Sequence, residues 1–309
     1  MSDGPLPLVS VVLPTRGRPE LVRLALGGVV DQRYDGPIEC FVVHDQEPPD
    51  LSLEELSRPG RSITVLSNTR TQGLAGSRNT GLEHVSADFV ASCDDDDIWH
   101  PDKLTEQMRR LEEDPSLVVV GAGIRLMMPE DRVVEWPARS PTVSQQELLR
   151  SRYKELHSST LLIRRKVFAA AGGYDEKLPE SYAEDYEWLL RAVQTGKIGT
   201  VERPLADIRK AGQSWFRERA EVVAAALEYM LAQHPEFRQS RRGHARVLGQ
   251  IAYARATSGD KASARRYARQ ALRRWPAAPH AWLAIAHLTT GVDPATALNV
   301  ARKLGRGIT

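Results

Sequence analysis

The chain has 309 residues, of which 41% are hydrophobic and 27% are charged, a balance that is typical of a folded globular protein. Its 42 Lys and Arg nearly cancel its 40 Asp and Glu, so the net charge of +2 gives no indication of a nucleic-acid-binding protein. The charges are unevenly distributed, because residues 211–309 hold 16 basic and 6 acidic side chains, whereas residues 1–210 hold 26 and 34. This asymmetry predicts two domains of opposite charge.

Three further features narrow the class of protein. The only cysteines, Cys40 and Cys93, lie in apolar stretches, so we do not expect a disulfide framework. Residues 1–8 lack a basic segment followed by an apolar run, so they do not resemble a signal peptide. No stretch approaches the roughly 20 apolar residues that span a bilayer. We therefore expect a cytoplasmic protein without a transmembrane segment.

Strands and helices alternate along the first two thirds of the chain. Short apolar runs rich in β-branched residues predict buried strands over 8–13, 39–43, 62–66, 88–92, 117–124 and 160–164. Helical spacing predicts helices over 19–30, 76–84, the residues before Gly172, and 182–193. This alternation indicates an α/β fold with a doubly wound, mostly parallel sheet. Ligands bind such sheets beyond the carboxyl ends of the strands, where the chain places residues 14–18, 45 and 94–97.

The chain changes character near residue 212, which predicts an α/β domain over 1–212 and a small all-α domain over 213–309. The second part is rich in Ala, Arg and Leu with helical periodicity, and its spacing resembles a tetratricopeptide repeat. An offset of 34 residues relates Leu248, Ile251 and Ala252 to Trp282, Ile285 and Ala286. An offset of 33 relates Ala262, Ala264 and Ala268 to Ala295, Ala297 and Ala301. A generic Ala-rich helical bundle is the alternative.

Four consecutive aspartates, residues 94–97, follow an apolar strand and precede Ile98-Trp99-His100-Pro101. Four carboxylates held together repel one another unless a cation lies between them. Mg²⁺ or Mn²⁺ takes oxygen ligands and often bridges to phosphates. A solvated acidic loop is the alternative, but the position directly after a buried strand favours a metal site.

Six segments occur in the order that is found in family 2 glycosyltransferases. They are LVSVVLPTRGR (8–18), FVVHD (41–45), GLAGSRNTG (73–81), FVASCDDDDIWHP (89–101), GGYDE (172–176) and EDYEWLLR (184–191). The chain therefore resembles this family over about residues 8–215. The resemblance implies a GT-A fold and inverting, metal-dependent transfer of a sugar from a nucleotide-sugar, most often a UDP-sugar, with Mn²⁺ or Mg²⁺ as cofactor.

The resemblance also implies a nucleotide-binding site at the ends of the first strands. Pro14, Thr15 and Arg16 would line the base and the ribose. Asp45 would accept a hydrogen bond from the nucleobase, and Arg78 would lie near the nucleotide.

The acidic residues receive their roles from the same resemblance. Asp94 and Asp95 would hold the ribose and the upstream side of the acidic motif, and Asp96 would ligate the metal that binds the diphosphate. Asp185 would be the general base, with Glu184 beside it.

The chemistry of the reaction agrees with these assignments. The acceptor is a weak nucleophile that must lose a proton as the new bond forms, and a carboxylate opposite the leaving group accepts it. The departing diphosphate gains negative charge, which a metal and Arg side chains stabilise. One base and one metal suffice for a single displacement with inversion. As an alternative, Glu184 and Asp185 are acidic residues that stabilise a helix N-terminus.

Three departures from the family pattern bear on the site. His44 stands where many relatives have the first of two aspartates, and we expect it to serve local structure. Lys210 stands where many relatives have a metal-binding His, before Gly212-Gln213-Ser214-Trp215; a charged lysine does not ligate a metal, and we expect it to contact the diphosphate instead. The Gln-x-x-Arg-Trp motif of membrane-embedded polysaccharide synthases is missing, which favours transfer of a single sugar.

Other functions remain open at this stage. A degenerate scaffold that binds partners through its repeats would share the fold, and a nucleotidyltransferase also uses an acidic metal site on an α/β sheet. The basic C-terminal part is either a solvated helical face or a dock for an acidic acceptor, a peptide or an anionic membrane surface. It lacks the aromatic residues of a single-strand binding surface. The sequence assigns neither the acceptor, be it a glycan, a small molecule or a peptide, nor the oligomeric state.

Overall fold

The computed structural model describes residues 5–210 and 219–291, which form two compact units. The first unit runs to residue 210 within the described part, except for residues 149–151 and 178–182. These two short segments belong to the second unit, together with the C-terminal helices. The predicted boundary between residues 212 and 213 lies outside the described residues.

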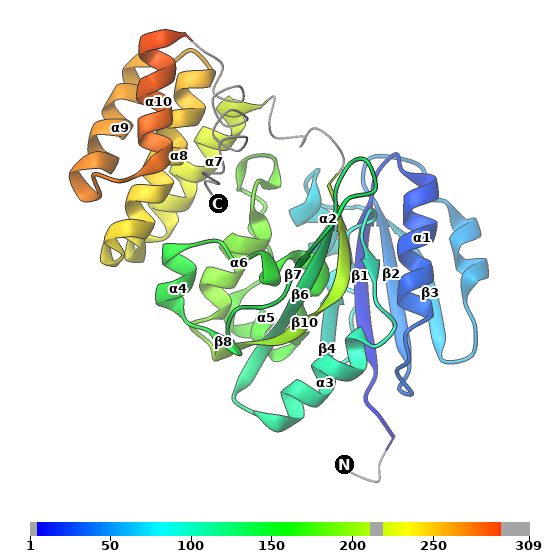
Figure 1. The fold of residues 1–309 in the computed structure, drawn as a ribbon. Coiled ribbons are helices and arrows are strands. Elements are labelled where there is room, and N and C mark those ends of the chain that lie inside the picture. The colour runs from blue at the N-terminus through cyan, green and yellow to red at the C-terminus, as the bar shows by residue number, and fades with distance from the viewer. Residues whose placement is uncertain (1–4, 211–218, 292–309) are drawn as a thin grey trace. The chain divides into compact units, whose positions relative to one another are not determined.

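A ten-stranded mixed sheet forms the centre of the first unit (Figure 1). Its strand order is β3 (Arg61–Ser67), β2 (Ile38–His44), β1 (Val9–Thr15), β4 (Phe89–Ser92), β9 (Leu162–Arg164), β6 (Leu117–Met127), β10 (Lys197–Arg209) and β5 (Ile98–Trp99). Two further strands, β7 (Val133–Trp136) and β8 (Thr142–Val143), pair with β6 and β10. Strands β3, β2, β1 and β4 are mutually parallel, as are β6 and β10. The predicted α/β class is confirmed.

Helices cover both faces of this sheet. They are α1 (Pro19–Val30), α2 (Leu74–Leu82), α3 (Lys103–Glu113), α4 (Gln145–Arg150), α5 (Lys166–Ala171) and α6 (Glu184–Ala192). Alternate residues of β1 point to opposite faces, so Val11 joins a core with α1 and α3, whereas Val12 packs toward Leu82 of α2 and Phe168 of α5. The sheet therefore lies between two layers of helices, and β1 packs against helices on both of its faces.

The structure contains every predicted strand and also elements that were not predicted, which are α3, α4, β5, β7, β8 and β10. The ends of each predicted strand lie within three residues of those expected. Strand β10 has no clear apolar pattern, because Glu202, Arg203 and Pro204 interrupt it; the pairing register with β6 shifts at the same place. The helix that was expected from residue 182 begins at Glu184, after Ala183 in a left-handed conformation with φ of 62°. That backbone costs about 1 kcal/mol for a residue other than glycine, and it places Glu184 and Asp185 in the first turn of α6.

The second unit contains α7 (Ala220–Gln233), α8 (Arg241–Thr257), α9 (Lys261–Arg274) and α10 (Pro279–Thr290). Alanine side chains form most of its core, and a Cβ on Gly249 of α8 would lie 3.1 Å from the amide nitrogen of Ala281 in α10, so these helices approach closely. Leu248 is buried, whereas its counterpart Trp282 is 54% exposed. The remaining repeat positions, 295, 297 and 301, lie outside the described residues, so the tetratricopeptide-like repeat stays a prediction. Among residues 5–210 and 219–291, no helix combines the length and the apolar composition that crossing a membrane requires.

One lysine is buried within the first unit. The Nζ atom of Lys103 donates to Oε1 of Gln107 at 2.8 Å and lies 3.9 Å from the centre of the Trp99 ring. Burial lowers the pKa of Lys103 to about 7, because neither of these partners carries a negative charge. The unfolded chain therefore takes up a proton here at higher pH than the folded chain does, and stability falls as the pH is lowered toward 7.

We expect Lys103→Met to raise the free energy of unfolding by about 3 kcal/mol at pH 7, because a buried methionine needs no deprotonation. The gain should shrink toward pH 10, where the unfolded chain also begins to lose this proton. Urea denaturation at the two pH values measures it, with the exposed Lys166→Met as the control. A gain that is the same at both pH values would contradict the account.

Candidate functional site

The acidic motif that follows β4 contacts the end of β1. The hydroxyl of Thr15 donates to Oδ2 of Asp95 at 2.8 Å. One guanidinium nitrogen of Arg18 lies 2.9 Å from Oδ1 of Asp95 and 2.9 Å from Oδ2 of Asp96. Burial raises the pKa of Asp95 even though Arg18 opposes the shift, and burial together with Asp94 raises the pKa of Asp96. Arg18 thus offsets part of the repulsion within the motif.

The predicted base-binding residues lie beside one another where β1 and β2 end. Pro14 pairs with Val43 across these parallel strands, and the pairing brings Arg16 near Asp45, with 3.7 Å between Nη1 and Oδ2. The buried carboxylate of Asp45 accepts hydrogen bonds from Asn68 Nδ2 at 2.8 Å and from the amide of Gly73 at 3.1 Å. It is therefore fixed to the loop that leads into α2.

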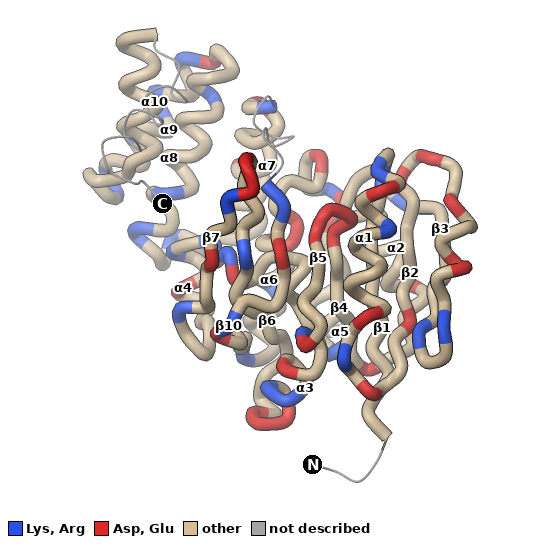
Figure 2. The backbone as a smooth tube through the Cα atoms, turned by 45° about the vertical axis from the view of Figure 1, so that its right-hand side comes forward, with Lys and Arg blue, Asp and Glu red and all other residues tan. Residues whose placement is uncertain are grey.

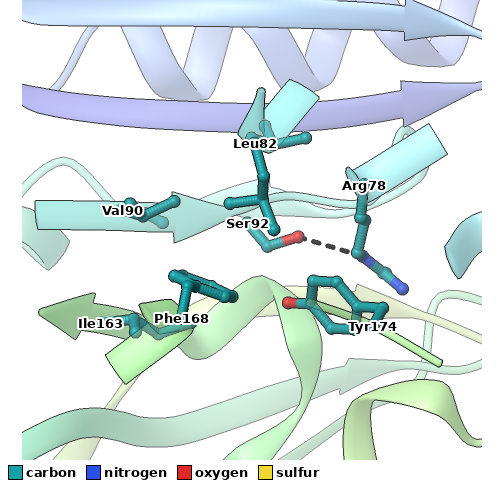
Figure 3. Close-up of a pocket in the computed structure, with 9 residues that line it drawn as sticks. Arg78, Leu82, Val90, Ser92, Ile163, Phe168 and Tyr174 are labelled. Carbon is teal, nitrogen blue, oxygen red and sulfur yellow. Dashed lines mark hydrogen bonds between the residues drawn. The ribbon is translucent and has the colours of Figure 1, made fainter. Parts of the chain in front are cut away.

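Arg78 of α2 is 1% exposed and connects the acidic motif to α6. Its guanidinium donates to Asp94 at 2.5 Å, to Glu184, and to the hydroxyl of Ser92 at 3.3 Å. Burial disfavours its charge, but the carboxylates, Asp94 foremost, raise the pKa of Arg78 above its usual value. Figure 3 shows Arg78 and Tyr174 beside a small cavity with otherwise mostly apolar walls; the guanidinium carbon is 5.4 Å from the centre of the Tyr174 ring.

Asp185 follows Glu184 in α6 and is 5% exposed. Nη2 of Arg152 donates to both of its carboxylate oxygens, at 2.8 and 3.1 Å. Burial by itself raises the pKa of Asp185, but the charges of Arg152, His157 and Arg78 outweigh burial and lower it. The carboxylate is therefore ionised at neutral pH, the state that a general base requires.

Asp94, Asp97 and His157 form the group of residues that fits a metal ion. One ligand atom from each lies within 4.8 Å of the others. Two carboxylates and an imidazole suit Mn²⁺, and carboxylates suit Mg²⁺. Burial, together with Asp94 and Asp96, raises the pKa of Asp97 well above its usual value, a penalty that a bound cation removes. The side chain of Asp96, the predicted ligand, lies next to this group and contacts Arg18 instead.

Hydrogen bonds hold this group in place. The hydroxyl of Ser158 donates to Asp94 at 2.8 Å, and the hydroxyl of Ser159 donates to Asp97 at 2.5 Å. The amide of Arg209, at the end of β10, donates to the second oxygen of Asp97 at 3.1 Å. The short 3₁₀ turn Ser158–Thr160 and the strand that the sequence did not reveal therefore both support the acidic motif.

A pocket of about 410 Å³ opens beside Asp96. Its walls include Ile98, Met127, Met128, Glu130, Arg209 and Lys210. The size suits a small-molecule ligand, and Lys210 brings a positive charge to it. His44, the other departure from the family pattern, lies elsewhere: its Nδ1 is 2.8 Å from Glu47 and its Nε2 accepts from the amide of Asp50. Both of its ring nitrogens therefore serve local structure.

Three of the site residues, Arg18, Arg152 and His157, received no role from the sequence, although residues 14–18 were expected at the strand ends. Arg18 directly follows the Pro-Thr-Arg-Gly segment, so its place at a strand end was a usable signal. Arg152 and His157 lie in an irregular segment between α4 and β9, where no periodicity marks a functional position. Only the structure brings them to Asp185 and Asp97.

We expect Arg78→Met to lower the free energy of unfolding by about 3–5 kcal/mol, because it leaves Asp94 and Glu184 buried without their counter-charge. Urea denaturation measures the change. Arg33→Met is a matched control, because Arg33 is 74% exposed and its pair with Asp102 spans 3.6 Å; it should change stability by less than about 0.5 kcal/mol. Equal stability of the two variants would show that the buried network contributes nothing.

The chain is similar in sequence to known proteins. The model of the family described as "Glycosyl transferase family 2" matches residues 10–171. An uncharacterized glycosyltransferase of Haemophilus influenzae is 23% identical over 218 residues, which cover 67% of this chain and 66% of that protein. The amylovoran biosynthesis glycosyltransferase AmsB of Erwinia amylovora is 25% identical over 238 residues, covering 73% of this chain and 77% of AmsB.

Solved structures share the fold. TarS 1-349 of S. aureus in complex with UDP-GlcNAc aligns with a TM-score of 0.58 and 17% identity, covering 97% of this chain and 93% of that one. The mannosyltransferase PcManGT of Pyrobaculum calidifontis in complex with GDP-Man and Mn²⁺ aligns with a TM-score of 0.54 and 18% identity, covering 98% of this chain and 81% of that one. In another structure of S. aureus TarS, with a TM-score of 0.56 and 16% identity, the alignment covers 87% of this chain and 49% of that one.

Proposed function

The chain belongs to glycosyl transferase family 2 and is a glycosyltransferase, and we propose that it moves a single sugar from a nucleotide-sugar to an acceptor, with metal dependence and inversion. One observation carries this proposal. The ionised carboxylate of Asp185 and the aspartate motif meet in one buried network, through Arg78 and Glu184. A base and a site for the leaving diphosphate are the two parts that a single displacement needs.

The proposed donor is a UDP-sugar that binds across the ends of β1, β2 and β4. Support comes from the TarS structure, which is described as a complex with UDP-GlcNAc, and from the polar groups that meet at these strand ends. In this proposal Pro14, Thr15 and Arg16 line the base and ribose, and Asp45 accepts a hydrogen bond from the base. Further residues on the donor side are Arg78, Asp94 and Asp95.

The proposed cofactor is Mn²⁺ or Mg²⁺. Asp96 lies at the pocket and remains the proposed ligand on the diphosphate side, and the cluster of Asp94, Asp97 and His157 beside it offers further donors. When bound, the ion supplies positive charge for the developing charge of the diphosphate. Arg18, whose nitrogen already bridges Asp95 and Asp96, lies where it adds a second positive charge.

In the proposed reaction Asp185 takes the proton of the acceptor as the acceptor attacks the anomeric carbon. Arg152 orients the Asp185 carboxylate by donating to both oxygens and keeps it ionised. Glu184 fixes the start of α6 by its contact with Arg78. The alternative account, in which these two acids only stabilise a helix N-terminus, does not require the contacts with Arg78 and Arg152.

Release of UDP from a panel of UDP-sugars with Mn²⁺ present, and water as acceptor, tests the proposal. We expect Asp185→Asn to lower this rate by about 10³-fold, because the amide accepts no proton, while UDP binding changes by less than about threefold. Asp88→Asn is the matched control, since the Asp88 side chain is 87% exposed. Substantial residual turnover in Asp185→Asn would remove this residue as base.

Measuring the released product distinguishes the alternative functions. A partner-binding scaffold releases no UDP from any donor. A nucleotidyltransferase releases pyrophosphate from a nucleoside triphosphate instead.

A further inference from the structure

Helix α9 (Lys261–Arg274) in the second unit has two chemically different sides. One side packs in the alanine core through Ala264, Ala268 and Ala271. The other side carries exposed cations at intervals of four residues, which are Lys261, Arg265, Arg269 and Arg273. We call these four side chains the basic row.

No negative charge within the helix balances the basic row. Between Lys261 and Arg274 the helix contains no Asp or Glu, as the blue and tan colouring of α9 shows in Figure 2. Within residues 5–210 and 219–291, no carboxylate lies within ion-pair distance of the row. Arg109 in α3 differs, because it contacts Glu106 at 3.0 Å and also Glu113.

The stability of α9 does not explain the basic row. Like charges four residues apart on a helix repel one another. Cations are favourable only near the C-terminal end of a helix, which accounts for Arg273 but not for Lys261 in the first turn. The buried alanines and the cap by Asp260, which accepts from the amide of Ser263 at 3.0 Å, already hold the helix. The row therefore points to a ligand outside the chain.

The shape of the row indicates a linear polyanion. A helix rises about 1.5 Å per residue, so successive cations are about 6 Å apart along the axis and the row is about 18 Å long. Three of the four are arginines, whose planar guanidinium matches carboxylate, phosphate or sulfate groups with paired hydrogen bonds. A line of such groups fits a chain that carries a negative charge at regular intervals.

We propose that the basic row docks an anionic polysaccharide, which is the acceptor of the transferase. Its role as acceptor rests on the proposed function, whereas its negative charge is inferred from the basic row alone. An anionic membrane is a poorer match, because an interfacial helix presents a broad apolar face, whereas Ala264, Ala268 and Ala271 of α9 are buried in the core of the second unit. Single-stranded nucleic acid requires stacking aromatics. The aromatic residue of α9, Tyr267, is only partly exposed and has Arg266 over its ring at 4.9 Å.

Binding of the full chain to polygalacturonate, a linear glycan with one carboxylate per sugar, tests the proposal, with neutral dextran as the blank. The test variant combines Lys261→Gln, Arg265→Gln, Arg269→Gln and Arg273→Gln. The control variant removes the same charge from exposed positions of the first unit by Arg33→Gln, Lys166→Gln, Lys177→Gln and Lys197→Gln. Glutamine forms helices well, and equal melting temperatures verify that both variants are folded.

We expect the row variant to bind polygalacturonate at least about tenfold more weakly than the wild type, with a smaller dependence on NaCl, because fewer ion pairs form. The control variant should stay within about twofold. Equal weakening in both variants overturns the proposal, as does tighter wild-type binding to phosphatidylglycerol vesicles or to oligo-dT than to the glycan.

A separate measurement tests the proposed function, namely the release of UDP from UDP-sugars with water as the acceptor. The row variant should keep the wild-type rate, since none of its four substituted residues belongs to the proposed site in the first unit. If the wild type binds the glycan through the row but releases no UDP, the docking proposal stands and only the proposed function is contradicted.

Discussion

The guanidinium of Arg78 is buried between the carboxylates of Asp94 and Glu184, and it joins α2, the loop after β4 and α6. A buried charge of this kind is stable only when its partners stay in place. Asp94 is 16 residues and Glu184 is 106 residues from Arg78 in the sequence, so the network forms only when these distant segments come together. The position of the neighbouring Asp185 in the first turn of α6 is thereby coupled to the position of the acidic motif.

The other charges of the site can be understood from this centre. Arg18 offsets Asp95 and Asp96 on the open side, and Arg152 keeps Asp185 ionised. Among the described residues, no arginine or lysine side chain forms an ion pair with Asp97, whose pKa is raised by burial and by Asp94 and Asp96, and Nδ1 of His157 lies 3.5 Å from its Oδ2. Arginine side chains therefore form ion pairs with most carboxylates of the site. At Asp97 a bound divalent cation would offset the cost of burying an unpaired negative charge.

Sequence alone predicted the α/β class and the convergence of three strand ends, because buried strands and the residues that follow them have a local signature. It did not predict which cation meets which carboxylate, since the partners of Arg78 come from segments that only the fold brings together. Strand β10 was missed because Pro204 and its charged neighbours hide its pattern. His157 was missed because it precedes a short 3₁₀ turn with no periodicity. Tertiary structure overrides local propensity at these positions.

Calorimetric titration of UDP into the wild type and into Asp96→Ala, each with Mn²⁺ and with EDTA, tests the central claim most directly. If the acidic motif is a metal-dependent nucleotide site, the wild type binds UDP at least about tenfold more tightly with Mn²⁺ than with EDTA, a difference of about 1.4 kcal/mol. Asp96→Ala loses most of that difference while keeping the affinity that is measured in EDTA. A wild type with the same UDP affinity in Mn²⁺ and in EDTA would contradict the account.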